Sequence, residues 1–158
     1  MTVAMPPHDA PAVRAHDAPA VRAPDAPPNP LDVLVVDDDP LFRRYLAHVL
    51  RQAGFHIRIA SDGPGLRAAL AQAVPDAVVL DVVLQSESGL DLCRELRAND
   101  AYCDLVIIAT SAAAGSMVTA RVDEVSALAA GANGFVPKGR SSEPLVAMIH
   151  QALAAEAA

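Results

Sequence analysis

The chain has 158 residues, 53% of them hydrophobic, which is enough for one domain with a sizeable core. The formal net charge of -7, with arginines that form no basic patch, argues against a surface for nucleic acid or anionic membrane. No apolar run approaches the ~20 residues of a membrane helix, and no signal peptide is recognisable. Cys93 and Cys103 lack metal-site spacing, so we expect free thiols in a reducing cytoplasm.

Residues 1–30 form a segment of their own, rich in proline and alanine. The sequence HDAPAVRA of residues 8–15 recurs at 16–23, and a partial third copy follows. Each proline removes a backbone donor and fixes φ, so neither a helix nor a sheet propagates here. We expect a disordered tail, in which the isolated His8 and His16 bind no metal.

The segment 31–153 alternates between short apolar runs and apolar residues at helical spacing. The apolar runs predict five strands, at 33–36, 55–59, 78–81, 105–109 and 135–136. The intervening segments predict five helices, which begin near Pro40, Leu66, Leu90, Val118 and Ser142. Asp39 is the expected N-cap of the first helix, and Ser141 or Ser142 that of the last.

Strict alternation of five strands and five helices predicts an α/β fold with one parallel sheet, helices on both faces and right-handed crossovers. We expect the doubly wound, flavodoxin-like strand order 2-1-3-4-5. In the fourth helix we expect four buried positions: Val118, Val122, Val125 and Leu128. Residues 154–158 are expected to fray as a short C-terminal tail.

Four of the five predicted strands end in a reactive side chain: Asp37 and Asp38 after the first, then Asp81, Thr110 and Lys138. Because the carboxyl ends of parallel strands share one edge of the sheet, we expect these side chains to lie together. Three carboxylates repel one another unless a cation neutralises them, and an all-oxygen set without His or Cys favours Mg²⁺. With the Lys138 ammonium and the Thr110 hydroxyl, the set suits phosphoryl transfer to Asp81 as the nucleophile.

Each of these residues also has an ordinary explanation when it is taken alone. An Asp before Pro40 is a common helix cap, but three consecutive Asp after a buried strand exceed what a cap needs. Thr110 alone is an ordinary strand-end residue, Lys138 a surface lysine and Phe135 core packing. The hypothesis of an active site depends on their occurrence together.

Four segments of the chain, in this order, resemble motifs of the receiver domain of two-component response regulators. They are VVDDDP at 35–40, VLD at 79–81 with Gly89 eight residues on, IIATS at 107–111, and GANGFVPK at 131–138. Each motif alone is weak, but four of them in order on the expected elements make a strong signal. The resemblance covers residues 31–153.

The resemblance implies a role for each residue of the site. Asp81 would accept a phosphoryl group from a sensor histidine kinase or a histidine phosphotransferase. The Mg²⁺ ligands would be Asp37, Asp38, Asp81 and the backbone carbonyl of Val83. Thr110 and Phe135 would form a switch pair, in which Thr110 moves toward the phosphoryl group and Phe135 turns from exposed to buried.

The chain departs from the family's pattern beside this site. Gly139 follows Lys138 where the family usually has proline, which loosens the turn that carries the lysine. Gln85 replaces a usual proline in the loop after Asp81. The segment after Thr110 is about two helical turns longer than it need be, and we expect residues 112–116 to form an extended loop.

Two further positions often tune dephosphorylation in this family. In this chain they are Val83, two residues after Asp81, and Ala112, two residues after Thr110. Neither side chain can position a water molecule by hydrogen bonding. We therefore expect slow self-hydrolysis of the phosphorylated protein.

We expect a stand-alone, chemotaxis-regulator-like response regulator that is a monomer or weak dimer. We do not expect an enzyme: its own chemistry would be Mg²⁺-dependent self-phosphorylation and slow self-dephosphorylation. Its partners would be the kinase or phosphotransferase and an unknown downstream protein, with no nucleic acid and no membrane. The alternative is a phosphorylation-independent scaffold of the same fold, which Gly139 slightly favours. An aspartyl-phosphate hydrolase ranks last, because such enzymes commonly have a second Asp where this chain has Val83.

Overall fold

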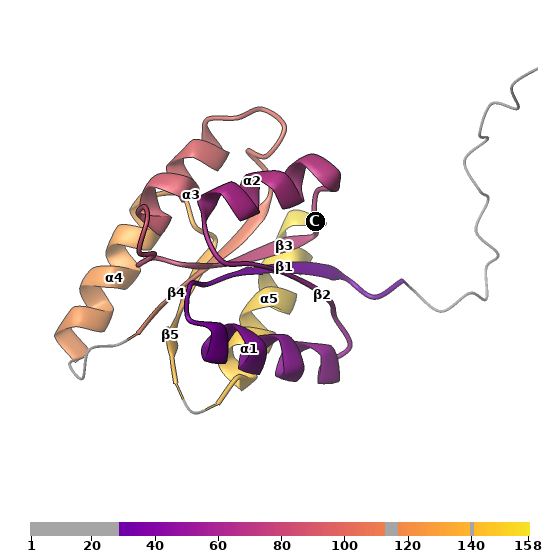
Figure 1. Ribbon diagram of the computed structural model, residues 1–158, viewed down its shortest axis with the longest axis horizontal. Helices are drawn as coiled ribbons and strands as arrows, with labels where there is room; N and C mark the ends of the chain where they lie inside the picture. The colour runs from indigo at the N-terminus through magenta and orange to yellow at the C-terminus, as the bar shows by residue number, and fades with distance from the viewer. Residues whose placement is uncertain (1–28, 113–116, 140) are drawn as a thin grey trace, which may run out of the picture.

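The alternating pattern folds into one five-stranded parallel sheet in the order β2-β1-β3-β4-β5 (Figure 1). The computed structural model describes residues 29–112, 117–139 and 141–158, so all but the last two residues of the predicted tail lie outside the described part. The strands are β1 (Asp32–Val36), β2 (His56–Ala60), β3 (Ala77–Asp81), β4 (Val106–Ala112) and β5 (Gly134–Lys138). The helices are α1 (Pro40–Gln52), α2 (Gly63–Gln72), α3 (Gly89–Arg97), α4 (Met117–Ala129) and α5 (Glu143–Glu156). The predicted fold class and strand order are confirmed.

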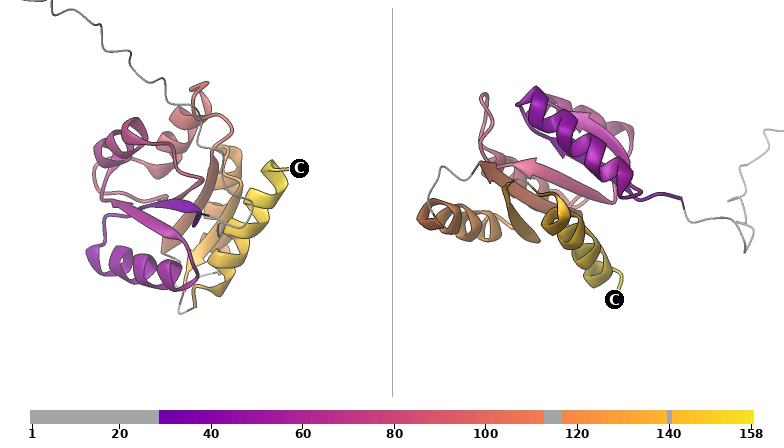
Figure 2. Two further views of the ribbon diagram at one scale, coloured as in Figure 1. Left: turned by 90° about the vertical axis from the view of Figure 1, so that its right-hand side faces the viewer. Right: turned by 90° about the horizontal axis from the view of Figure 1, so that it is seen from below.

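Each face of the sheet is covered by its own helices (Figures 1 and 2). Helices α1 and α5 cover one face; the core beneath them, here the α1/α5 core, includes Val35, Leu50, Val79, Ile108 and Ile149. Helices α2, α3 and α4 cover the other; their core, the α2/α3/α4 core, includes Leu34, Leu66, Leu80, Leu92 and Phe135. All five residues of β3 are buried, which explains why four apolar residues, 77–80, precede Asp81 without a polar residue between them.

The start of α1 is fixed by a side chain. The Asp39 carboxylate accepts hydrogen bonds from the backbone N–H groups of Leu41 (2.9 Å) and Phe42 (3.2 Å). Pro40 occupies the first helical position, where its missing N–H is not needed. Asp39 alone therefore satisfies the predicted cap, and the two carboxylates before it are available for another purpose.

The fourth helix turns a different face to the sheet from the one predicted. Val125 is 68% exposed and Leu128 is 47% exposed, whereas Ala127 is fully buried. The prediction that Val125 and Leu128 are buried is wrong, because this helix carries apolar residues at helical spacing on both faces and the smaller ones lie against the sheet. The side chains of the two other predicted positions, Val118 and Val122, lie outside the described part of the chain.

Several elements extend beyond their predicted ends. Strand β4 continues to Ala112, and β5 runs from Gly134 to Lys138. Helix α5 continues to Glu156, beyond the predicted end of the domain at residue 153. Among the described residues, no helix is both long enough and apolar enough to cross a membrane.

Arg97, the last residue of α3, connects two loops at the amino ends of β4 and β5. Its guanidinium group donates hydrogen bonds to the carbonyl oxygens of Leu105 and Gly131 and to Asn133 Oδ1, each at 2.7 Å. Asn133 Oδ1 also accepts the N–H of Ile107 at 2.8 Å. The planar fork of arginine thus fixes where both strands begin, which a lysine could not do.

We expect Arg97→Lys to lower the free energy of unfolding by about 1–3 kcal/mol, because a lysine leaves partly buried acceptors without a donor. Arg94→Lys on the same helix is the matched control: Arg94 forms an exposed ion pair with Asp91 at 2.7 Å. Pairs of that kind contribute about 0–1 kcal/mol. Urea unfolding of both variants measures the difference, and equal losses would contradict the role given to Arg97.

Candidate functional site

The alternation of side chains along the strands brings four polar residues to one place. Each polar residue follows, by two positions, an apolar residue of the α1/α5 core. These apolar residues are Val35, Val79, Ile108 and Val136. On the same face, two positions further along, the chain has Asp37, Asp81, Thr110 and Lys138. The parallel register aligns them at the carboxyl edge, since Asp81 pairs with Thr110 and Thr110 with Val136.

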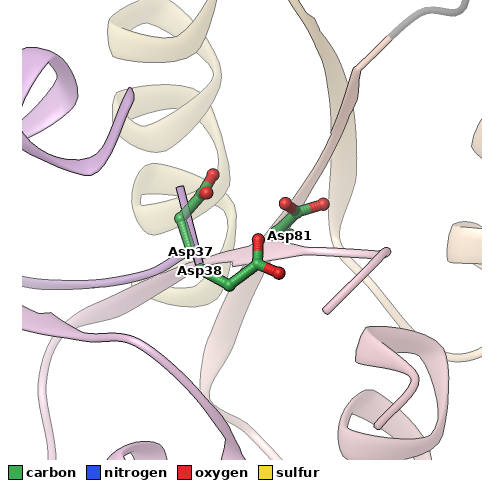
Figure 3. A group of neighbouring side chains, drawn as sticks. All are labelled: Asp37, Asp38 and Asp81. Atoms are coloured by element: carbon green, nitrogen blue, oxygen red, sulfur yellow. The ribbon is translucent and has the colours of Figure 1, made fainter. Parts of the chain in front are cut away.

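Three carboxylates form an acidic cluster at this edge, from Asp37, Asp38 and Asp81 (Figure 3). One oxygen of each lies within 4.8 Å of the others. Asp37 is 1% exposed and Asp81 is 4% exposed, whereas Asp38 is only partly buried. Two negative charges are thus largely removed from water, which is unfavourable unless a counter-charge is present.

Lys138 supplies the first counter-charge. Its Nζ lies 2.6 Å from Asp37 Oδ2 and 2.7 Å from Asp81 Oδ2, and its side chain is 13% exposed. Burial acts to lower the pKa of Lys138, but its contacts with Asp37 and Asp81 outweigh burial and raise the pKa above the ordinary value. Lys138 is also the only lysine in the sequence, so no other residue of its kind can replace it.

The site keeps an excess of negative charge after this pairing. Three carboxylates and one ammonium group sum to a charge of -2 when all are ionised. Burial raises the pKa of Asp81, and its hydrogen bonds to Lys138 and to the Val83 N–H offset only part of that rise. A set of carboxylate oxygens with a charge of -2 fits a divalent cation such as Mg²⁺.

Thr110 brings a hydroxyl group that has no hydrogen-bond partner among the described residues. The residue is 3% exposed, and it lines a small cavity together with Phe42, Val136 and Lys138. Buried hydroxyl groups in proteins are normally paired. Thr110 Oγ1 is therefore a donor available to an anionic oxygen bound at this edge.

Phe135 lies on the opposite face of the sheet from Thr110. It pairs with Ala109 across β4 and β5, and its side chain is 8% exposed in the α2/α3/α4 core. Of the two positions expected for this side chain, it occupies the buried one. A coupled movement of Thr110 and Phe135 stays a prediction.

The loop after Asp81 folds tightly over the end of β3. The Val83 N–H donates to Asp81 Oδ1 at 3.0 Å, and the Gly89 N–H donates to the Val82 carbonyl at 3.0 Å. A Cβ atom on Gly89 would lie 1.9 Å from the carbonyl oxygen of Asp81. Only glycine allows this approach, which places the Val83 backbone beside the acidic cluster.

The same loop is held at two points, by Asp38 of the acidic cluster and by Arg67 of α2. The Gln85 N–H donates to Asp38 Oδ2 at 3.0 Å. Glu87 forms an ion pair with Arg67 of α2 at 3.0 Å, and Arg67 also pairs with Glu95 of α3 at 2.7 Å. A proline in place of Gln85 would lack the N–H that orients Asp38.

Sequence reasoning missed three residues around the site. The Phe42 ring centroid lies 4.5 Å from Lys138 Nζ, and Arg43 Nη1 donates to the Asp37 carbonyl at 2.5 Å. Both are in the first turns of the helix that follows the acidic pair, and this position was a usable signal. Arg67 gave none, because its partners are 20 and 28 residues away in the sequence.

The fold and the edge site define a doubly wound α/β domain with an acidic, metal-type centre. Residues 33–150 match the model of the response regulator receiver domain, and the chain belongs to this family. The edge site occupies the positions of the receiver motifs identified in the sequence.

Individual relatives agree with this assignment. Sensory transduction protein RegX3 of Mycobacterium tuberculosis is 36% identical over 124 residues, which cover 77% of this chain and 50% of RegX3. DNA-binding response regulator MtrA of Mycolicibacterium smegmatis is 36% identical over 121 residues, with 77% and 50% covered. The chain spans about half the length of the curated relatives it matches. The crystal structure of NtrX from Brucella abortus superposes with a TM-score of 0.71 at 29% identity, covering 80% of this chain and 28% of NtrX.

We expect Asp81→Asn to stabilise the metal-free protein near neutral pH by about 1 kcal/mol, or roughly 3 °C in the unfolding temperature. Burial raises the pKa of Asp81, so the ionised form is less favourable in the folded than in the unfolded chain. That penalty is absent below the ordinary carboxyl pKa of about 4 and develops as the pH rises through the folded-state value.

The gain from Asp81→Asn should therefore shrink as the pH falls toward about 4. Thermal unfolding of wild type and variant across this range measures it. Asp91→Asn, at a carboxylate on the exposed side of α3, is the control and should change little. A loss of stability in Asp81→Asn near neutral pH would contradict the argument.

Proposed function

We propose that the chain accepts a phosphoryl group on Asp81 from a histidine kinase or a histidine phosphotransferase, and that it signals through the resulting change of its surface. One observation carries the proposal: a buried carboxylate, within an acidic cluster, is held by the only lysine at 2.7 Å. An Asp81 oxygen would attack phosphorus while the bond from phosphorus to the histidine nitrogen breaks. The electron pair of that bond leaves with the imidazole.

The acidic cluster would hold Mg²⁺ through four groups: Asp37, Asp38, Asp81 and the backbone carbonyl of Val83. When bound, the ion supplies positive charge to the phosphoryl oxygens. The chain's own residues orient this set, because Gln85 fixes Asp38 and Gly89 lets the Val83 backbone approach. Lys138 would stay beside the phosphoryl oxygens as a second positive charge.

Thr110 and Phe135 would transmit the change. The unpartnered hydroxyl of Thr110 would donate to a phosphoryl oxygen, and its inward movement would favour the buried position of Phe135. The surface of α4, β5 and α5 would then present a different shape to a downstream protein. The shift in population is limited by the difference in contacts between the two states.

The chain would act as a phosphoacceptor, with Mg²⁺-dependent self-phosphorylation and slow self-dephosphorylation as its own chemistry. We propose the cytoplasm as its location, where Cys93 and Cys103 stay as the free thiols seen in the structure. A downstream protein, and not nucleic acid, is the partner we expect for a chain with a net charge of -7.

Incubation with acetyl phosphate and Mg²⁺ tests the assignment of Asp81. Mass spectrometry of the wild type should show one labile phosphoryl group, which Asp81→Asn should lose. Asp38→Asn should still be labelled but should need more Mg²⁺, because it removes a cluster oxygen and leaves the nucleophile in place. Equal labelling of wild type and Asp81→Asn would refute the assignment.

A phosphorylation-independent scaffold is the second candidate, favoured by one observation. A Cβ atom built on Gly139 would meet, apart from its chain neighbours, only the Pro137 carbonyl oxygen, at 3.9 Å. Glycine at this position lacks the restraint on φ that a proline would impose on the residue after Lys138. A wild-type protein that binds Mg²⁺ but takes no label from either acetyl phosphate or a phosphohistidine donor would favour this candidate.

We expect the phosphorylated protein to hydrolyse slowly. Val83 is 68% exposed and its N–H donates to Asp81, and Ala112 pairs with Lys138 across the sheet, so both residues lie beside the site. Neither can hold a water molecule for attack on phosphorus. Val83→Asn should shorten the half-life of the acyl phosphate several-fold, measured by loss of label in Mg²⁺ buffer. A wild-type half-life of a few seconds would contradict this prediction.

A further inference from the structure

The Phe42 ring lies against the ammonium group of Lys138. The distance from Nζ to the ring centroid is 4.5 Å, within the range of a cation–π contact. Phe42 is in the first turn of α1, which Asp39 and Pro40 hold in place. The ring is partly buried against the α1/α5 core, and Tyr45 lies beside it with ring centroids 6.0 Å apart. Its position is therefore set by the helix and not by the lysine.

The backbone of Lys138 does not by itself fix the position of the ammonium group. Lys138 is the last residue of β5, where it pairs with Ala112 of β4, and the following Gly139 adds no side chain beside it. A lysine side chain has four rotatable bonds and loses much conformational entropy when it is fixed. Contacts made by the side chain must therefore hold the ammonium group in the site.

The three described contacts of this ammonium group differ in kind. Asp37 and Asp81 attract it as carboxylates, but they are also the oxygens that a divalent cation would take. The Phe42 ring offers the negative face of its quadrupole, which no metal in the acidic cluster competes for. The ring is thus the contact that persists when the carboxylates are neutralised.

We propose that Phe42 is a positioning residue for Lys138, whose ring keeps the ammonium group beside Asp37 and Asp81. This inference rests on the proposed function, in which Lys138 meets the phosphoryl oxygens. Phe42 itself would touch no reacting atom. The competing explanation is that Phe42 only fills space in the core.

Nuclear magnetic resonance tests the contact without any activity. Because the chain has one lysine, selective labelling of lysine gives a single set of side-chain signals. The ε-CH₂ protons of the wild type should be shifted upfield by the Phe42 ring, both with and without Mg²⁺. Phe42→Tyr should keep the shift and Phe42→Leu should remove it. An ε-CH₂ signal at its unfolded position in the wild type would overturn the proposal.

The rate of phosphorylation by acetyl phosphate tests the consequence. Phe42→Leu keeps an apolar side chain of similar size but loses the ring, and it should slow phosphorylation about threefold to tenfold. Phe42→Tyr should stay within about twofold of the wild type. An equal rate in Phe42→Leu and wild type would overturn the proposal.

Fluorinated phenylalanine at position 42 separates positioning from packing. Added fluorine atoms weaken the negative face of the ring with little change of size, so each should slow phosphorylation further. Phe55 is the matched control: it is 4% exposed in the same core and packs against His150 at 4.9 Å. Fluorination there should leave the rate unchanged, and an equal response at both positions would show that Phe42 only packs.

Failure of the two proposals can be told apart. A wild type that takes no phosphoryl label, but shows the ring shift of its lysine, would refute the proposed function and leave the contact established. A wild type that is labelled, with no ring shift and no effect of Phe42→Leu, would refute the role of Phe42 alone.

Discussion

The ion pair that Lys138 forms with Asp37 and Asp81 is the contact on which the carboxyl edge of the sheet depends. Two nearly buried carboxylates on adjacent strands would repel each other in a medium of low dielectric constant. The lysine reduces that repulsion but leaves an excess of negative charge. The edge is thus stable enough to fold and still suited to bind a cation. Removing the lysine would leave two uncompensated buried charges, whereas adding a cation would complete the balance.

This arrangement follows from two simple regularities of parallel sheets. Side chains two residues apart share a face, so an apolar residue of the α1/α5 core is followed at each strand end by a polar residue on the same side. The parallel register then aligns the ends of neighbouring strands. The core below and the site above are therefore parts of one pattern. A shift of one residue in any strand would turn its apolar side chains away from the α1/α5 core. The same shift would turn its polar end residue away from the site.

The fold and the four strand-end residues could be predicted because both depend on local sequence pattern. The alternation of apolar runs and helical segments predicts the sheet, and Asp81 is a charged residue at the end of an apolar strand. The exposed Val125 and Leu128 were mispredicted because both faces of α4 carry apolar residues. Arg67 could not be assigned, because its partners are distant in sequence and only the tertiary structure brings them together, whereas Phe42 lies in the helix that directly follows the acidic pair.

Two of the chain's departures from the family's pattern, Gln85 and Gly139, have different physical consequences. With Gln85 in place of proline, the loop after Asp81 keeps a backbone N–H, and that N–H bonds to Asp38. The change thus adds a restraint to a carboxylate of the acidic cluster. With Gly139 in place of proline, the residue after Lys138 lacks the fixed φ of a proline ring. The departure beside the acidic cluster therefore adds a hydrogen bond, whereas the departure beside Lys138 removes a restraint on φ. An aromatic side chain on α1, anchored by its own helix cap, adds a contact to the ammonium group on the side that carries the lysine.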